Sequence, residues 1–374
     1  MPLSNCHGPA SFFFWHVVEV MTLDNKMTIE HTSRTGSLPW VEKYRPSTLD
    51  EVVAHEEILS TTRRLIDSGS MPHFLFYGPP GTGKTTTVKA CAHYLFGKER
   101  VRANVLEMNA SDDRGIDVVR QQVREFASTS SIFCTNSSNP VSSFKLVILD
   151  EADQMSGDAQ AALRRIIEKY TKNVRFCIIC NRINKIIPAL QSRCTRFRFA
   201  PVKKGAMLPR LKFVVQEEGV RFTEEGLAAA FRLCNGDMRR CLNIMQSSAM
   251  SAGEVTEESV YRTTGNPTPA EVRGIVEDML AHDYALSWEK MQQAVIEKGV
   301  SATDLVREVH HIVMAMDLPV DCKCFLLTKL ADVEYYAASG TRESINIGGV
   351  LGAFQLVKEA LTQKKPILLL AQHN

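Results

Sequence analysis

The residues best placed to do chemistry lie in the stretch GPPGTGKT, which runs from Gly78 to Thr85. This stretch fits the phosphate-binding pattern G-x-x-x-x-G-K-[ST] in full. It follows the apolar run HFLFY and precedes a helical stretch, which is the strand–loop–helix context that the pattern requires. Glycines let successive backbone N–H groups turn toward a phosphate, and the N-terminus of the helix adds positive potential. The alternative is a glycine-rich turn that binds no ligand.

The pattern assigns separate roles to two of its side chains. Lys84 is expected to reach the β- and γ-phosphates of ATP, and Thr85 is expected to hold Mg²⁺. The backbone of the loop and the first turn of the helix complete the predicted phosphate site, which comprises Gly78, Pro79, Pro80, Gly81, Thr82, Gly83, Lys84, Thr85 and Thr86.

A second set of residues suited to chemistry, two acidic side chains, follows the apolar run in LVILDE. The run places Asp150 and Glu151 at the carboxyl end of a buried strand, where ligands bind in open α/β sheets. Asp150 is expected to help hold Mg²⁺, and Glu151 to polarise an attacking water, which favours hydrolysis over transfer to a small molecule. Asn181, after a later strand, is positioned to hydrogen-bond the γ-phosphate or the water. The alternatives are a solvated acidic turn and an ordinary turn-forming asparagine.

The cysteines predict neither a disulfide framework nor a metal site. Ten are scattered through the chain, from Cys6 to Cys324, which fits a reducing compartment. Cys177 and Cys180 form a C-x-x-C inside VRFCIIC, which has the pattern of a buried strand. Three residues apart on a strand, the two side chains point to opposite faces, so they are interpreted as core thiols.

The elements that must position these residues alternate from about Trp40 to Phe199. Strands are expected at 73–77, 103–108, 144–150, 174–180 and 195–199, with helices at 84–96, 115–127 and 158–170. Near-continuous apolar strands alternating with helices predict an α/β domain with a parallel sheet covered on both faces. After Pro201 the pattern predicts short helices and no strand. The breaker cluster at 265–271 precedes five further helical stretches that reach about Leu361.

The length of 374 residues and these changes of pattern predict four segments. They are a poorly ordered N-terminal extension (1–36), an α/β domain (37–200), a small helical domain (201–266) and an all-helical C-terminal domain (267–374). A signal peptide is the disfavoured alternative for the apolar stretch SFFFWHVVEV; Met21 or Met27 could also serve as translation starts. The sequence has no run of about 18 apolar residues, so no membrane span is expected. A polar, Ser-rich loop is expected at 131–143.

The net charge is only +2, so a polyanion would have to meet a local basic patch rather than the whole surface. Residues 161–200 contain ten Lys or Arg and a single acid, Glu168. Arg196 and Arg198 alternate with Phe197 and Phe199, so they are expected to face away from the core on a strand. The alternative for the whole cluster is a solvated basic face.

Six motifs together resemble the small subunits of the eukaryotic replication factor C clamp loader, a branch of the AAA+ ATPases. They are PWVEKYRP, GPPGTGKT, NASDDRGID, ILDEAD, KIIPALQSRC and GDMRR. The resemblance covers residues 38–362. It implies an AAA+ P-loop sheet, a helical lid and a helical collar through which subunits assemble, and it implies a nuclear ATPase that acts in DNA replication and repair.

The resemblance also implies roles for particular residues. Val41, Arg45 and Val53 match positions that hold the adenine end of the nucleotide. Asn181 and Arg239 match two positions that sense its phosphates, the second from the lid.

Arg193 matches the arginine finger, which completes the ATP site of a neighbouring subunit. This interpretation is strengthened if no acidic side chain of its own chain pairs with Arg193. The alternative is a surface salt bridge.

The implied partners are the other subunits of a hetero-oligomeric ring, a sliding clamp, and primer-template DNA. Arg114, Arg120 and Lys185 are expected to contact DNA phosphates, with Lys185 at the start of a helix, and would not read the base sequence. Two other functions remain open: a nucleotide-binding scaffold that contributes mainly its arginine finger, and another AAA+ ATPase of replication initiation.

Overall fold

The computed structural model describes residues 38–110, 116–128, 144–299, 301–363 and 367. The expected N-terminal extension and the Ser-rich loop lie outside these residues. The chain divides into two compact units, one ending at Thr256 and the other beginning at Glu257, and each is described separately.

The first unit is built on a five-stranded sheet. Its strands are β1 (Phe74–Tyr77), β2 (Val105–Asn109), β3 (Lys145–Asp150), β4 (Val174–Cys180) and β5 (Thr195–Arg198). Their order across the sheet is β2-β3-β4-β1-β5, and every neighbouring pair is parallel. The predicted parallel sheet is confirmed.

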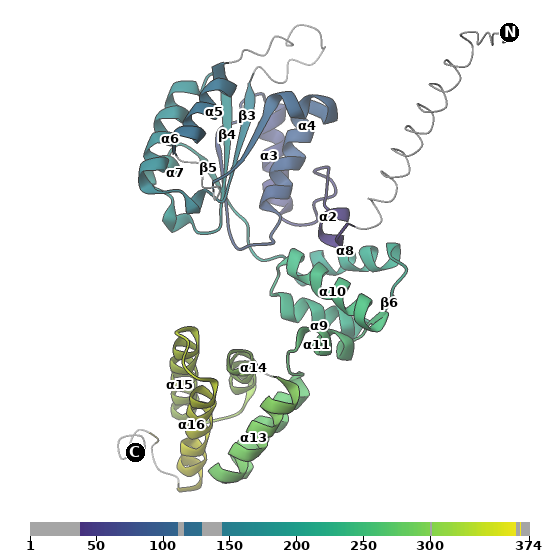
Figure 1. Cartoon of the computed structure of the whole chain (residues 1–374), viewed down its shortest axis with the longest axis vertical. Helices are drawn as coiled ribbons and strands as arrows, with labels where there is room; N and C mark the ends of the chain where they lie inside the picture. Colours follow the sequence, from purple (N-terminus) through teal and green to yellow (C-terminus); the bar gives the residue numbers. More distant parts are fainter. Residues whose placement is uncertain (1–37, 111–115, 129–143, 300, 364–366, 368–374) are drawn as a thin grey trace, which may run out of the picture. The chain divides into compact units, whose positions relative to one another are not determined.

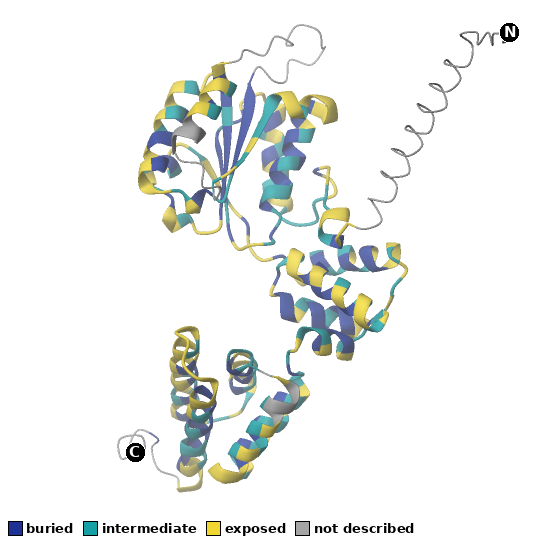
Figure 2. Cartoon of the chain, in the orientation of Figure 1, coloured by how far each residue is buried: buried dark blue, intermediate teal, exposed yellow. Residues whose placement is uncertain are grey.

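Helices cover both faces of the sheet, as Figure 1 shows. On one side lie α3 (Glu56–Asp67) and α4 (Lys84–Asn104); on the other lie α5 (Ile116–Ser128), α6 (Gly157–Tyr170) and α7 (Pro188–Gln191). A hydrophobic core lies on each face of the sheet. The side chains along a strand contribute to the two cores in turn, because successive side chains point to opposite faces. Figure 2 shows the central strands β1, β3 and β4 as the most deeply buried part of this domain.

The two faces separate neighbouring side chains of β1 and β4. Phe74, Phe76 and Cys177 belong to the core under α3 and α4, whereas Leu75 and Cys180 belong to the opposite core. Burial raises the pKa of the Cys180 thiol to about 12 and that of Cys177 well above its ordinary value. The interpretation of this pair as core thiols on opposite faces is confirmed.

One boundary differs from the sequence-based expectation. The helix after the glycine-rich loop was expected to end at Phe96, but α4 continues to Asn104 after a break at Gly97, where φ is 71° and ψ is 162°. Glycine adopts this positive φ without the Cβ clash that other residues meet. The following strand therefore begins at Val105 rather than at residue 103.

A small helical domain completes the first unit. It contains α8 (Lys204–Glu217), α9 (Glu224–Cys234) and α10 (Met238–Ala252). The expectation that no strand follows Pro201 is wrong: β6 (Arg221–Phe222) and β7 (Glu254–Val255) form a short parallel pair. Two-residue strands are too short to show the alternation by which a strand is recognised in a sequence.

The second unit is helical throughout its described residues. It begins with α11 (Glu257–Thr264), and its main helices are α12 (Pro269–Ala281), α13 (Tyr284–Lys298), α14 (Ala302–Ala315), α15 (Val320–Ala338) and α16 (Glu343–Gln363). Their shared core includes Val309, Leu326, Leu351 and Phe354. The five helical stretches expected after residue 271 are confirmed. Within the described part of the chain, each helix is too short or too polar to cross a bilayer.

Candidate nucleotide-binding site

The glycine-rich loop between β1 and α4 is shaped by two close backbone approaches. A Cβ on Gly78, where φ is +146°, would lie 2.0 Å from the carbonyl oxygen of Phe199. A Cβ on Gly81, where φ is +66°, would lie 1.6 Å from Oδ1 of Asp237. Only glycine fits these positions without displacing its neighbour, and at Gly81 that neighbour belongs to the helical domain.

Lys84 is the first residue of α4 and is only 6% exposed. Its Nζ donates hydrogen bonds to the carbonyl oxygens of Gly78 (2.8 Å) and Pro79 (2.7 Å) and to Oδ1 of Asn181 (3.0 Å). Burial lowers the pKa of Lys84, although the carboxylate of Asp150 acts in the opposite direction. The ammonium group is thus held at the mouth of the glycine-rich loop, with its donors fixed by the fold.

The acidic residues after β3 lie beside the start of α4. The Thr85 hydroxyl donates a hydrogen bond of 2.8 Å to Oδ2 of Asp150, and the backbone N–H of Glu151 donates one of 2.9 Å to Oδ1. Glu151 has left-handed backbone angles, with φ 54° and ψ 36°. This conformation is uncommon for a residue with a Cβ, and such strained residues cluster at functional sites.

The order of the strands explains why Asn181 meets these residues. It follows β4, which lies between β1 and β3, so the ends of all three strands converge. The buried carboxylate of Asp153 accepts hydrogen bonds from the backbone N–H groups of Asn181 (3.4 Å) and Arg182 (3.3 Å). Asp153, which lies in the turn η1 (Ala152–Gln154), was not predicted to take part. The sequence shows that Asp153 lies three residues after Asp150, but it does not show that the Asp153 side chain is buried.

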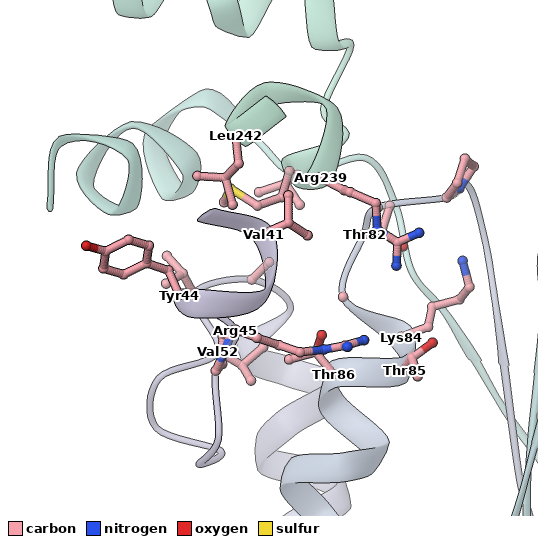
Figure 3. A pocket seen from close by; sticks show the side chains of 18 of the residues that line it. Val41, Tyr44, Arg45, Val52, Thr82, Lys84, Thr85, Thr86, Arg239 and Leu242 are labelled. Carbon is pink, nitrogen blue, oxygen red and sulfur yellow. The ribbon is translucent and has the colours of Figure 1, made fainter. Parts of the chain in front are cut away.

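A cavity of about 280 Å³ is lined at one end by Lys84, Thr85, Asp150, Glu151 and Asn181. The first helix of the described chain lines its other end. That helix is α2 (Trp40–Lys43), and Val41, Tyr44 and Arg45 contribute to the wall. The helical domain adds Arg210 from α8 and Met238, Arg239 and Leu242 from α10. Figure 3 shows Arg239 extending from α10 toward the glycine-rich loop, and Val41 facing Leu242.

Most of the predicted nucleotide-site residues line this cavity. They are Val41, Arg45, Val53, Pro80, Gly81, Thr82, Gly83, Lys84, Thr85, Thr86, Asp150, Glu151, Asn181 and Arg239. Gly78 and Pro79 do not line it, but their carbonyl groups hold Lys84. Among the lining residues that the prediction missed are Tyr44, Arg210, Met238 and Leu242. They line the cavity because segments more than 150 residues apart meet, as in the Arg210–Tyr44 hydrogen bond.

Arg193 lies outside the cavity, two residues after α7, and it has an acidic partner in its own chain. Its Nη2 is 2.5 Å from Oε1 of Glu168, and its Nη1 donates a hydrogen bond of 2.7 Å to the carbonyl oxygen of Ala189. The absence of an acidic partner, which would have strengthened the interpretation of Arg193 as an arginine finger, is therefore not observed. Arg196 and Arg198 are exposed on β5 and Phe199 is buried, as their alternation predicted.

The residues expected to contact DNA are only partly described. Lys185 is exposed, but it ends the 3₁₀ turn η2 (Ile183–Lys185) rather than beginning a helix as expected. Arg120 lies on α5, and Arg114 lies outside the described residues.

The sheet order, the glycine-rich loop and the acidic strand end define a P-loop ATPase of the AAA class. Residues 74–202 match the family described as ATPase family associated with various cellular activities (AAA). Residues 267–353, in the second unit, match the family described as Replication factor C C-terminal domain. The expected fold class and the expected ATPase activity are confirmed.

Individual relatives show which proteins of these families the whole chain is similar to. The chain is 50% identical to Replication factor C subunit 5 of Mus musculus over 329 residues, which cover 88% of this chain and 95% of the relative. It is 48% identical to Probable replication factor C subunit 5 of Dictyostelium discoideum, covering 86% and 92% of the two chains. It is 42% identical to Replication factor C subunit 3 of Schizosaccharomyces pombe, covering 86% and 91%.

The chain therefore belongs to the replication factor C subunit family, whose members are ATPase subunits of clamp loaders. Within that family, the motifs LPWVEKYRP, SRCTRFRF and LTKLADVEY indicate the subunit called subunit five in animals. Relatives with that name from mouse, human and Dictyostelium agree with this prediction.

Proposed function

We propose that this chain binds ATP with Mg²⁺ in the cavity between the glycine-rich loop and α2. It hydrolyses the ATP as one subunit of a hetero-oligomeric ring in the nucleus. The ring opens a sliding clamp and loads it on primer-template DNA. The observation that supports the proposal best is the convergence of Lys84, Thr85, Asp150 and Asn181 at one end of a cavity whose other end is lined in part by apolar side chains.

The donors at the polar end suit a triphosphate. Lys84 and the backbone N–H groups at the start of α4 would hold the β- and γ-phosphates, and Arg239 would reach them from α10. The apolar side chains Val41, Val53 and Leu242 would enclose the adenine, with Arg45 at the same wall. Hydrolysis rather than phosphoryl transfer fits Glu151, which would orient and polarise the attacking water.

The residues beside Lys84 also suit a magnesium ion bound through ATP. Mg²⁺ prefers oxygen ligands, and at phosphate sites it takes one or two from the protein and the others from phosphates and water. The Thr85 hydroxyl and the Asp150 carboxylate, already 2.8 Å apart, provide such a pair. The ion would neutralise charge on the phosphates.

We also propose that three basic residues contact DNA. Arg114, Arg120 and Lys185 would grip phosphates without reading bases, because they supply point charges and no recognition helix. Replacing all three with Ala in the assembled complex should reduce the salt slope of DNA binding by about 0.9 per lost phosphate contact. An unaltered slope in a complex that still assembles would show that these charges belong to a solvated face.

A single substitution tests the nucleotide site. Lys84→Ala should abolish ATP binding by the full chain, because the glycine-rich loop loses the only charged side chain that it directs at the β- and γ-phosphates. Lys89→Ala is the matched control: Lys89 is on the same helix, but it pairs with Glu107 and lies outside the cavity lining. ATP titrations of both variants decide the matter, and equal affinity for the two would refute the assignment.

A further inference from the structure

One carboxylate of the helical domain holds the segment that forms a wall of the cavity. Glu218 directly follows α8, and its Oε1 accepts hydrogen bonds from Nζ of Lys43 (2.8 Å) and from the hydroxyl of Tyr44 (2.7 Å). Tyr44 lines the cavity, whereas Glu218 and Lys43 do not. A group outside the cavity is therefore bonded to a group that shapes it.

Further contacts join the same elements. The guanidinium of Arg210, on α8, donates a hydrogen bond of 2.9 Å to the carbonyl oxygen of Tyr44. The backbone N–H of Trp40 donates one of 3.1 Å to Oε1 of Gln246, on α10. The Tyr44 ring meets Phe213 edge to face, with ring centroids 6.3 Å apart. The α2 segment is thus bound to the two helices that supply the helical domain's share of the cavity wall.

The carboxylate makes the strongest of these contacts. Hydrogen bonds to an ionised group are about twice as strong as those between neutral groups. The Glu218 side chain is 19% exposed, so solvent screens it less than a fully exposed pair. Although burial acts against it, the bonds from Lys43 and Tyr44 lower the pKa of Glu218. Figure 3 shows the Tyr44 hydroxyl pointing away from the cavity, which leaves it available to this partner.

We propose that Glu218 is a positioning residue for nucleotide binding. By accepting hydrogen bonds from Lys43 and Tyr44, Glu218 fixes the α2 segment, which would enclose the adenine, to the helical domain that carries Arg239. The groups that bind the adenine and the arginine that binds the phosphates are then held in one fixed arrangement. This inference rests on the proposed function, since it takes the cavity to be the ATP site. Without Glu218 the wall would have to be ordered during binding, and ordering side chains reduces affinity.

The first test compares two neighbouring acidic residues in the full chain. Glu218→Ala should weaken ATP binding about tenfold, because it removes both hydrogen bonds that order Lys43 and Tyr44. Glu217→Ala is the matched control, because it removes the same charge one residue earlier at an exposed position. In the assembled complex, Glu218→Ala should raise KM for ATP and leave kcat unchanged, since it removes binding shared by the ground and transition states.

The second test exchanges the charges. Glu218→Lys alone should weaken ATP binding at least as much as Glu218→Ala, and the double variant with Lys43→Glu should recover most of the affinity. The thermal unfolding midpoint of Glu218→Ala should lie within about 5 °C of that of Glu217→Ala, so the chain stays folded at the temperature of the titration and the loss of affinity reflects positioning rather than unfolding.

Two results would overturn the inference: equal ATP affinity of Glu218→Ala and Glu217→Ala, or no recovery in the double variant. Lys84→Ala run alongside distinguishes this failure from a failure of the proposed site. If Lys84→Ala abolishes binding while Glu218→Ala has no effect, the site is correct and the positioning role is wrong.

Discussion

At the scale of single residues, Arg193 pairs with Glu168 in its own chain, and the family resemblance makes it an arginine finger toward a neighbouring subunit. Its ion pair with Glu168 joins side chains that are 35% and 43% exposed, and exposed pairs of this kind contribute only about 0–1 kcal/mol. An arginine finger increases the rate of ATP or GTP hydrolysis by a factor of about 10³–10⁵, because it stabilises the charge of the transition state. The observed ion pair is thus weak enough that the phosphates of a nucleotide bound beside Arg193 would displace Glu168.

Arg193→Ala should leave ATP binding by its own chain intact and lower hydrolysis at the adjacent site by as much as about a thousandfold. Arg196→Ala is the control, because Arg196 is an exposed arginine on the neighbouring strand. The measurement is turnover scored separately at each site of a reconstituted ring. Loss confined to the chain that carries the substitution would mean that Arg193 acts in cis.

At the same scale, the sequence predicted the groups that a motif defines and missed those defined by folding. Lys84, Thr85 and Asp150 could be assigned because motif spacing and a strand end determine their positions. The ion pair of Arg193 could not, because Glu168 lies on α6 and Arg193 lies in the turn after α7, 25 residues further along a basic stretch. Asp153 was missed because its burial depends on how η1 packs under the end of β4.

At the scale of elements, β1 and β4 are joined by a buried histidine just before β1. The backbone N–H of Phe176 donates a hydrogen bond of 3.1 Å to Nδ1 of His73. Burial, together with the nearby charge of Arg175, lowers the pKa of His73 from 6.5 to about 4. The unfolded chain therefore binds a proton between pH 6.5 and pH 4 that the folded chain does not bind, so stability falls as the pH falls through this window.

His73→Asn should remove this dependence, because the amide oxygen can still accept from Phe176 and the amide does not titrate. Between pH 7 and pH 5 the free energy of unfolding of the native chain should drop by about 2 kcal/mol more than that of the variant. Urea unfolding at the two pH values measures the difference, with His311→Asn, at an exposed position on α14, as the control. An identical drop in native chain and His73→Asn would show that His73 titrates normally in the folded protein.

The elements also show where local pattern stops being informative. Each strand of the main sheet was predicted because it is an apolar run bounded by turn residues. The pair β6 and β7 was not, because two residues on each side are held by a partner more than 30 positions away. The hydrogen bonds that join the α2 segment to the helical domain could likewise not be predicted from the sequence. They involve polar residues such as Lys43 and Glu218, whose local sequence is typical of an exposed surface.

At the scale of the whole molecule, the first unit carries the chemistry and the second carries the family's characteristic C-terminal domain. The strands of the main sheet end near residue 200, the small helical domain completes the first unit, and the described residues of the second unit form helices without a strand. Two interpretations of such a molecule differ in one respect. A catalytic subunit hydrolyses ATP at its own site, whereas a scaffold binds nucleotide there and contributes mainly its arginine finger.

Glu151→Gln separates these interpretations most directly. In a reconstituted complex, the phosphate-binding lysines of the other subunits are replaced, so that this chain holds the only competent ATP site. ATP affinity should stay within about twofold, while turnover should fall by a factor of about 10² to 10⁴, because the water loses its polarising carboxylate. Turnover equal to that of the unsubstituted chain would contradict the account, since Glu151 would then have no part in hydrolysis at this site.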